Sequence, residues 1–180
     1  MEREMDLRGK EAASLSSLVK KEYQIPDSYY FGEVKRGLRN SDGTGVLIGV
    51  TKVGSVQGYL IEDGRRIPVP GKLYYRGIDL NEIVEAHRKS GTFGYEEVAY
   101  LLLMGHLPTK SELSYFNDIM CKARKLPEGF TEGMIMRHPS RDIMNDLARS
   151  VLLLYSYDEN PDDISAENLL TQSIKLIGSF

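Results

Sequence analysis

A change of periodicity at Gly77 constrains the fold of this chain more than any other feature. Before it, residues 46–75 contain the short β-branched runs VLIGVTKV, SVQGYLIE and RRIPVP, which are separated by Gly54, by Asp63-Gly64 and by Gly71. After it, apolar residues recur at helical spacing. Asp-Gly is a favoured pair for a tight hairpin turn, so the β runs predict antiparallel strands. The sequence therefore predicts a mainly α-helical protein with a small antiparallel β-hairpin region near residues 46–75.

Capping signals mark the helices that follow. Asp79 with Glu82, and Thr109 with Glu112, have the spacing of a capping box. Gly105 suits the end of the helix YEEVAYLLLMG, because glycine adopts positive φ freely. Upstream, residues 7–22 predict a short amphipathic helix, and the glycines, prolines and aspartates that follow predict a loop.

Two apolar helices are predicted at the end of the chain, at about 140–157 and 164–180. The first is apolar around most of its circumference, which predicts burial on nearly all sides and packing against more than one partner. The second closes at Phe180 without a polar tail or a glycine cap. We therefore expect the chain to be a fragment of a longer protein.

Composition excludes several classes of function. A length of 180 residues favours one domain, and a net charge of −3 gives no basic field for nucleic acid. The single cysteine, Cys121, excludes an internal disulfide framework and a cysteine zinc cluster, and it fits a reducing compartment such as the cytoplasm. The N-terminus is too charged for a signal peptide, and the apolar run at 98–104 is too short to span a bilayer.

Two groups of residues are candidates for binding an anion. Gly43, Gly45 and Gly49 have dinucleotide-loop spacing, but a loop precedes them and a β-rich run follows, so a turn is favoured over a nucleotide site. The other group is the basic cluster of Lys35, Arg36 and Arg39, for which a solvated face is favoured over an anion site.

The three histidines and the paired carboxylates are candidates for acid-base chemistry. His87 is predicted at the surface of a charged helix, and His106 follows a helix C-terminus, where the dipole favours an imidazolium. His138 either pairs with Asp142 as an oriented base or, as we favour, forms the entry to the long apolar helix with Pro139. Glu96-Glu97 are adjacent on a helix and point about 100° apart, so they cannot form a catalytic dyad. Asp162 and Asp163 are also adjacent carboxylates, in the predicted loop DENPDD.

Several stretches, in this order and at these separations, resemble the citrate synthase family. They are GVLIGVT, LYYRGIDL at 73–80, YEEVAYLLLMGHLPT at 95–109 followed by SELSYF, the His138-Pro139 pair, and AENLLTQSIKLIGSF at the end. The long β region resembles bacterial members in particular. The family's HPM is here His138-Pro139-Ser140.

The resemblance implies a mainly helical, dimeric two-domain enzyme that condenses acetyl-CoA with oxaloacetate to citrate and CoA. In that family a carboxylate removes a methyl proton, one histidine hydrogen-bonds the enol and a second activates the ketone. The resemblance places those groups beyond Phe180, so we expect no catalytic, cofactor-binding or metal-binding residue in this chain and no activity from it alone. It also assigns Arg76 to a strand-to-helix turn, where a guanidinium can satisfy carbonyls, rather than to the substrate.

The resemblance also implies a domain organisation. Residues 1–180 would form the N-terminal part of the large domain, with an N-terminal helix and loop at 1–45, β-hairpins at 46–75 and helices at 76–180. The small domain and the C-terminal part would be absent. We expect a homodimer or pairing with a C-terminal half through the helices at 140–157 and 164–180. The alternative is a non-catalytic helical interaction module or a split-enzyme subunit.

Overall fold

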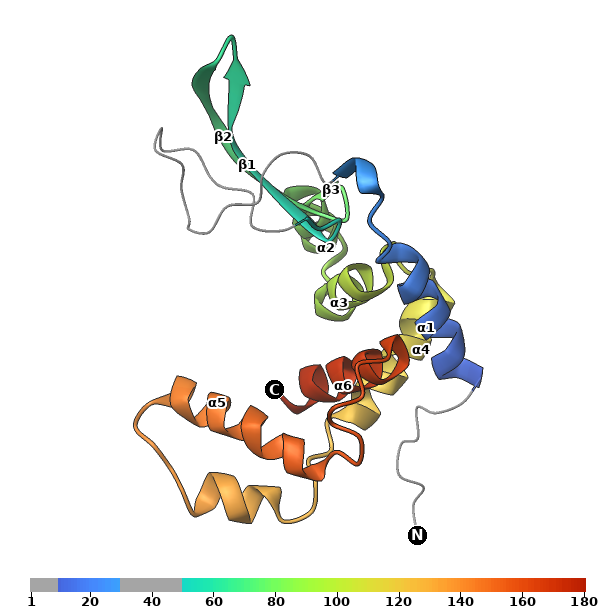
Figure 1. Ribbon diagram of the computed structural model, residues 1–180, viewed down its shortest axis with the longest axis vertical. Coiled ribbons are helices and arrows are strands. Elements are labelled where there is room, and N and C mark those ends of the chain that lie inside the picture. Colours follow the sequence, from blue (N-terminus) through green and yellow to red (C-terminus); the bar gives the residue numbers. More distant parts are fainter. Residues whose placement is uncertain (1–9, 30–49) are drawn as a thin grey trace. The chain divides into compact units, whose positions relative to one another are not determined.

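The computed structural model describes residues 10–29 and 50–180 (Figure 1). It confirms the predicted fold class, because helices dominate and the strands form one small antiparallel sheet of order β1-β2-β3. Contacts divide the chain into two compact units, Met1–Leu18 with Thr109–Phe180, and Val19–Pro108. Within the described ranges, no helix combines the length and the apolar character needed to cross a membrane.

The unit Val19–Pro108 contains the sheet. Its strands are β1 (Gly54–Glu62), β2 (Arg65–Tyr75) and β3 (Ile78–Asp79). Asp63 and Gly64 both have positive φ, 49° and 72°, and they join Glu62 to Arg65 in register. These are the dihedrals of a two-residue hairpin turn of the primed type, which confirms the predicted Asp-Gly turn.

Two details of the predicted strands are wrong. Gly71 was expected to end a strand, but β2 continues through it. The pairing register between β1 and β2 shifts between Gln57 and Tyr59, and Gly71 lies within this irregular part of β2. The run VLIGVTKV contributes no strand at residues 50–53, and residues 46–49 lie outside the described part. At this point the hydroxyl of Thr51 accepts a hydrogen bond from the backbone N–H of Val53, and such a local turn competes with strand pairing.

Helices α2 (Leu80–Ser90) and α3 (Tyr95–Met104) follow the sheet. Asp79 caps α2 by accepting from the N–H of Asn81, not in the predicted capping box with Glu82, and its carboxylate also lies 3.5 Å from Lys72. Gly105 ends α3 at φ 89°, as predicted. The same unit contains the end of α1 (Lys10–Glu22) and the short 3-10 helix η1 (Asp27–Tyr29). Its buried apolar residues are Ile83, Tyr100, Leu101 and Met104.

In the other unit, α4 (Lys110–Ala123) and α6 (Ala166–Ser179) lie side by side (Figure 1). Thr109 and Glu112 form the predicted capping box at the start of α4, and Ser165 caps α6. The packing is close, because a Cβ on Gly178 would lie 2.7 Å from the Cβ of Ala123. The buried apolar residues here are Phe116, Ile119, Met120, Ala123, Phe130, Met134, Leu170 and Ile174.

The segment between α4 and α6 was only partly predicted. A π-helix, η2 (Thr131–Met136), was not expected and precedes α5 (Ile143–Leu154), which ends in the 3-10 helix η3 (Tyr155–Tyr157). Within this chain α5 has no buried residue. The predicted burial of this helix on nearly all sides is therefore not found within the described residues, since no segment covers its outer apolar side chains.

Candidate functional site

Arg76 lies in the turn between β2 and β3 in an unusual conformation. Its φ is 49°, in the left-handed region that non-glycine residues seldom adopt, and its backbone N–H donates to the carbonyl of Val53 at 2.9 Å. Its Nη2 donates to the carbonyl of Leu102 at 2.7 Å. The ring of Tyr23 faces the guanidinium, 4.8 Å from its carbon, and the Tyr23 hydroxyl also donates to Leu102. The strained backbone is thus held by contacts from three directions.

The bonded carbonyl explains why an arginine fits this position. Leu102 is in the last turn of α3, where backbone carbonyls have no partner within the helix and where the helix dipole is negative. A guanidinium supplies both the missing donor and the complementary charge. This geometry agrees with the predicted bracing role of Arg76.

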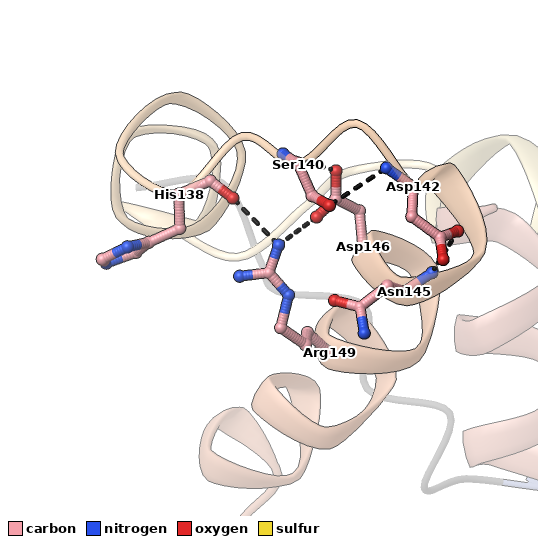
Figure 2. Close-up of polar contacts among 6 residues, drawn as sticks. All are labelled: His138, Ser140, Asp142, Asn145, Asp146 and Arg149. Atoms are coloured by element: carbon pink, nitrogen blue, oxygen red, sulfur yellow. Dashed lines mark hydrogen bonds and ion pairs between the residues drawn. The ribbon is translucent and has the colours of Figure 1, made fainter.

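His138 and Asp142 do not form the pair that an oriented base would need. Figure 2 shows the imidazole of His138 pointing away from the carboxylate of Asp142. That carboxylate accepts from the N–H of Asn145 at 3.2 Å and so caps α5, which is consistent with the helix entry favoured for His138 and Pro139. The hydroxyl of Ser140 accepts from the N–H of Asp142 at 3.0 Å. The geometry supports a helix entry and gives no support to an oriented base.

Sequence reasoning missed the two residues that hold this entry together, Asp146 and Arg149. One oxygen of Asp146 accepts from the N–H of Ser140 at 3.1 Å, and the other forms an ion pair with Arg149 (Figure 2). Arg149 also donates to the carbonyl of His138 at 3.0 Å. The i,i+3 spacing of an acid and an arginine in the first turns of a helix was the available signal.

The remaining histidines have structural surroundings. His106 follows the end of α3, as predicted, and its ring meets that of Tyr100 edge to face at 5.5 Å between centroids. His87 was predicted at the surface, but its side chain is only 17% exposed. The prediction failed because Gly94, which has no side chain, leaves room for the His87 ring to pack against the backbone. A Cβ on Gly94 would lie 2.4 Å from that ring.

Glu96 and Glu97 are in the first turn of α3, and Asp162 and Asp163 are in the loop before α6. Asp162 accepts from the hydroxyl of Tyr155 at 3.1 Å, which raises the pKa of that phenol, and Asp163 accepts from the N–H of Ser165 at 2.8 Å. No three His, Cys, Asp or Glu side chains gather as metal ligands would among the residues described. Gly43, Gly45, Gly49, Lys35, Arg36 and Arg39 lie outside the described residues.

A shallow apolar groove runs along α5. Its volume is about 220 Å³, and its apolar lining includes Phe130, Ile143, Leu147, Leu154 and Phe180. On the rest of α5, the side chains of Met144 and Leu152 are 73% and 75% exposed. An apolar surface of this kind is suited to contact with another protein segment rather than to chemistry.

Comparison with known proteins places the chain in one class. The sequence-family model described as citrate synthase, C-terminal domain, matches residues 42–180. The citrate synthase of Haloferax volcanii is 31% identical over 132 residues, which are 73% of this chain and 29% of that protein. The citrate synthase of Corynebacterium glutamicum is 38% identical over 87 residues, which are 48% of this chain and 18% of that protein.

A citrate synthase-related protein of Dictyostelium discoideum is also similar, with 29% identity over 108 residues, 60% of this chain and 24% of that protein. The chain belongs to the citrate synthase family. It spans less than a third of the length of the relatives that it matches. The Arg76 turn, α3 and the entry to α5 all lie within the matched range.

Proposed function

We propose that this chain is the N-terminal portion of a citrate synthase-like acyltransferase that condenses acetyl-CoA with oxaloacetate to give citrate and CoA in the tricarboxylic acid cycle. The observation that supports the citrate synthase-like activity is the family match over residues 42–180, and the N-terminal placement within the enzyme is part of the proposal. In this reading acetyl-CoA is a substrate, the chain binds no separate cofactor, and the enzyme works in the cytoplasm.

The proposal gives the described residues a scaffolding role. His87, His106 and His138 each have surroundings that explain them without catalysis: a contact with Glu97, a ring contact with Tyr100, and a helix entry. We infer that the catalytic histidines and carboxylate belong to the remainder of the enzyme, so that no catalytic, cofactor-binding or metal-binding residue is assigned here. We also propose that residues 1–180 form the N-terminal part of the large domain, as expected from the sequence.

The exposed apolar surface of α5 supports the proposal that this helix packs against another protein chain. Two large side chains that are almost three-quarters exposed, Met144 and Leu152, lie on a helix that buries none of its residues within the chain. Burying such side chains is worth about 1.5 to 3 kcal/mol each. We propose that this surface packs against a second copy of the chain or against the C-terminal half of the enzyme.

A CoA-release assay tests the proposal. This chain is assayed with acetyl-CoA and oxaloacetate, first alone and then mixed with the part of the Haloferax volcanii citrate synthase that follows the matched region. Activity only in the mixture supports the proposal, and activity of the chain alone would show that catalytic groups lie within it. If the two chains bind each other but remain inactive, the rival reading of a non-catalytic interaction module is favoured.

A further inference from the structure

His87, in the last turn of α2, faces the first turn of α3 across the connection between the two helices. Its Nδ1 lies 2.8 Å from the hydroxyl of Thr92, and its Nε2 lies 3.6 Å from Oε1 of Glu97. Nε2 is buried and has no hydrogen-bond partner. The ring packs against Gly94, where a Cβ would lie 2.5 Å from Nε2.

The neighbouring hydroxyl groups determine which nitrogen carries a proton. Ser90 Oγ lies 3.0 Å from the carbonyl of Ala86 and 3.2 Å from that of His87, and a carbonyl can only accept, so Ser90 donates there. The 2.7 Å contact between the Ser90 and Thr92 hydroxyls then requires Thr92 to donate. Thr92 has one proton, so it must accept from Nδ1 of His87. All these contacts are satisfied only when Nδ1 carries hydrogen.

This assignment makes the second nitrogen sensitive to pH. In the neutral ring Nε2 presents a lone pair to the carboxylate of Glu97, and the two acceptors have no proton between them. In the imidazolium, Nε2 carries an N–H. The positively charged ring then faces the negatively charged carboxylate of Glu97. Both helix dipoles favour the charged pair, because His87 is at the negative end of α2 and Glu97 at the positive end of α3.

Two other charged pairs lie at or near α2. On the elements that pack against it, Lys72 of β2 lies 3.5 Å from Asp79, and on α2 itself Arg88 forms an ion pair with Glu85 at 2.8 Å. Of the charged side chains in residues 10–29 and 50–180, Glu97 is the one within ion-pair distance of His87.

We propose that His87, Thr92 and Glu97 form a pH-sensitive latch between α2 and α3, closed when the His87 ring is protonated and loosened when it loses the proton from Nε2. The closed state is the ion pair between the imidazolium and the carboxylate of Glu97, with Nδ1 held by Thr92. The latch does not depend on the enzymatic function proposed above.

The first test reads the ring directly. NMR of the ¹⁵N-labelled histidines in the full chain, from pH 5 to 8.5, reports the protonation and the tautomer of His87. We expect the neutral ring at high pH to carry its proton on Nδ1. A neutral ring with its proton on Nε2 would overturn the proposal, because Nε2 could then donate to Glu97 without a change of charge.

The second test measures the latch by hydrogen exchange. The amides of Gly91 and Thr92 both donate to the carbonyl of His87, so their protection reports whether the end of α2 is closed. Corrected for the intrinsic exchange rate, the opening constant of these amides should rise about two- to fivefold between pH 5.5 and 8, the range expected for a partly exposed ion pair.

Glu97→Gln should abolish this change, because its amide can donate to the neutral Nε2. The matched controls are Glu96→Gln, which removes the same charge from the same turn, and His138→Gln, which removes an exposed histidine. Both should retain the wild-type change. Equal pH dependence in Glu97→Gln and the wild type would exclude the latch.

Discussion

The guanidinium of Arg76 donates a 2.7 Å hydrogen bond to the carbonyl of Leu102, in the last turn of α3. This contact joins the turn after β2 to a helix end that is distant in sequence. A hydrogen bond from a charged donor is worth about 1.5 to 3 kcal/mol, and the left-handed backbone of Arg76 depends on its neighbours to persist.

We predict that Arg76→Ala lowers the free energy of unfolding by about 1.5 to 3 kcal/mol, measured by urea denaturation. Arg76→Lys should recover only part of this loss, because an ammonium cannot stack on Tyr23 as a planar guanidinium does. The control is Arg88→Ala, which removes a 71% exposed arginine from a surface pair and should cost about 0.5 kcal/mol or less. Equal losses at the two positions would argue against the bracing role.

Gly178 is predicted to tolerate no side chain. An alanine Cβ there would lie 2.7 Å from the backbone carbon and the Cβ of Ala123, where α6 meets α4. Gly→Ala inside a helix normally stabilises by up to about 1 kcal/mol, but this overlap should reverse the sign and destabilise by roughly 1 to 3 kcal/mol. Thermal unfolding measures the difference. Gly133→Ala, which meets no atom within 4 Å, is the control and should not destabilise by this mechanism.

The carboxylate of Asp79 predicts a pH dependence at the start of α2. Its pKa is lowered, chiefly because the N–H of Asn81 donates to it, with Lys72 adding to the effect. A lowered pKa means that the folded state binds the proton less readily than the unfolded chain. The stability that this charge contributes is therefore present above the ordinary value near 3.8 and is lost as the pH falls through the lowered pKa.

The test is Asp79→Asn, which keeps a capping side chain but removes the charge. The difference in urea midpoint between this variant and the wild type should be largest near pH 7 and should shrink as the pH approaches 3. Asp118→Asn, at an exposed position of α4, controls for the loss of one negative charge. A difference that stays constant over this range would count against the assignment.

The sequence predicted the elements that depend on local chemistry. The Asp63-Gly64 turn and the capping box of Thr109 and Glu112 need only residues close in the chain, and both formed as expected. The order of helices after Gly77 was also correct in outline. These features follow from short-range spacing, which a single sequence contains in full.

The failures came from contacts between segments. His87 looked like a surface residue until Gly94 was seen to leave space for its ring, and Gly71 looked like a strand end until β1 set the register of β2. The role of Arg149 could not be predicted either, because it depends on a hydrogen bond to the carbonyl of His138, eleven residues earlier in the chain. Helical spacing reports which residues are apolar, but not which partner covers them, and α5 shows this most clearly.

The exposed side of α5 leads to the last prediction. Met144 and Leu152 are 73% and 75% exposed, so they can contribute little to the stability of the chain itself but much to an interface. The double variant Met144→Lys with Leu152→Lys should weaken self-association about tenfold or more in sedimentation equilibrium, while the unfolding midpoint stays close to that of the wild type.

Ile164→Lys, at an 83% exposed position before α6, is the control, and it adds one charge and removes one apolar side chain outside α5. If Ile164→Lys weakens association as much as the double variant, the effect is one of charge alone. If the wild-type chain is strictly monomeric, pairing of this surface with a second copy is excluded, and the C-terminal half of the enzyme becomes the partner to test.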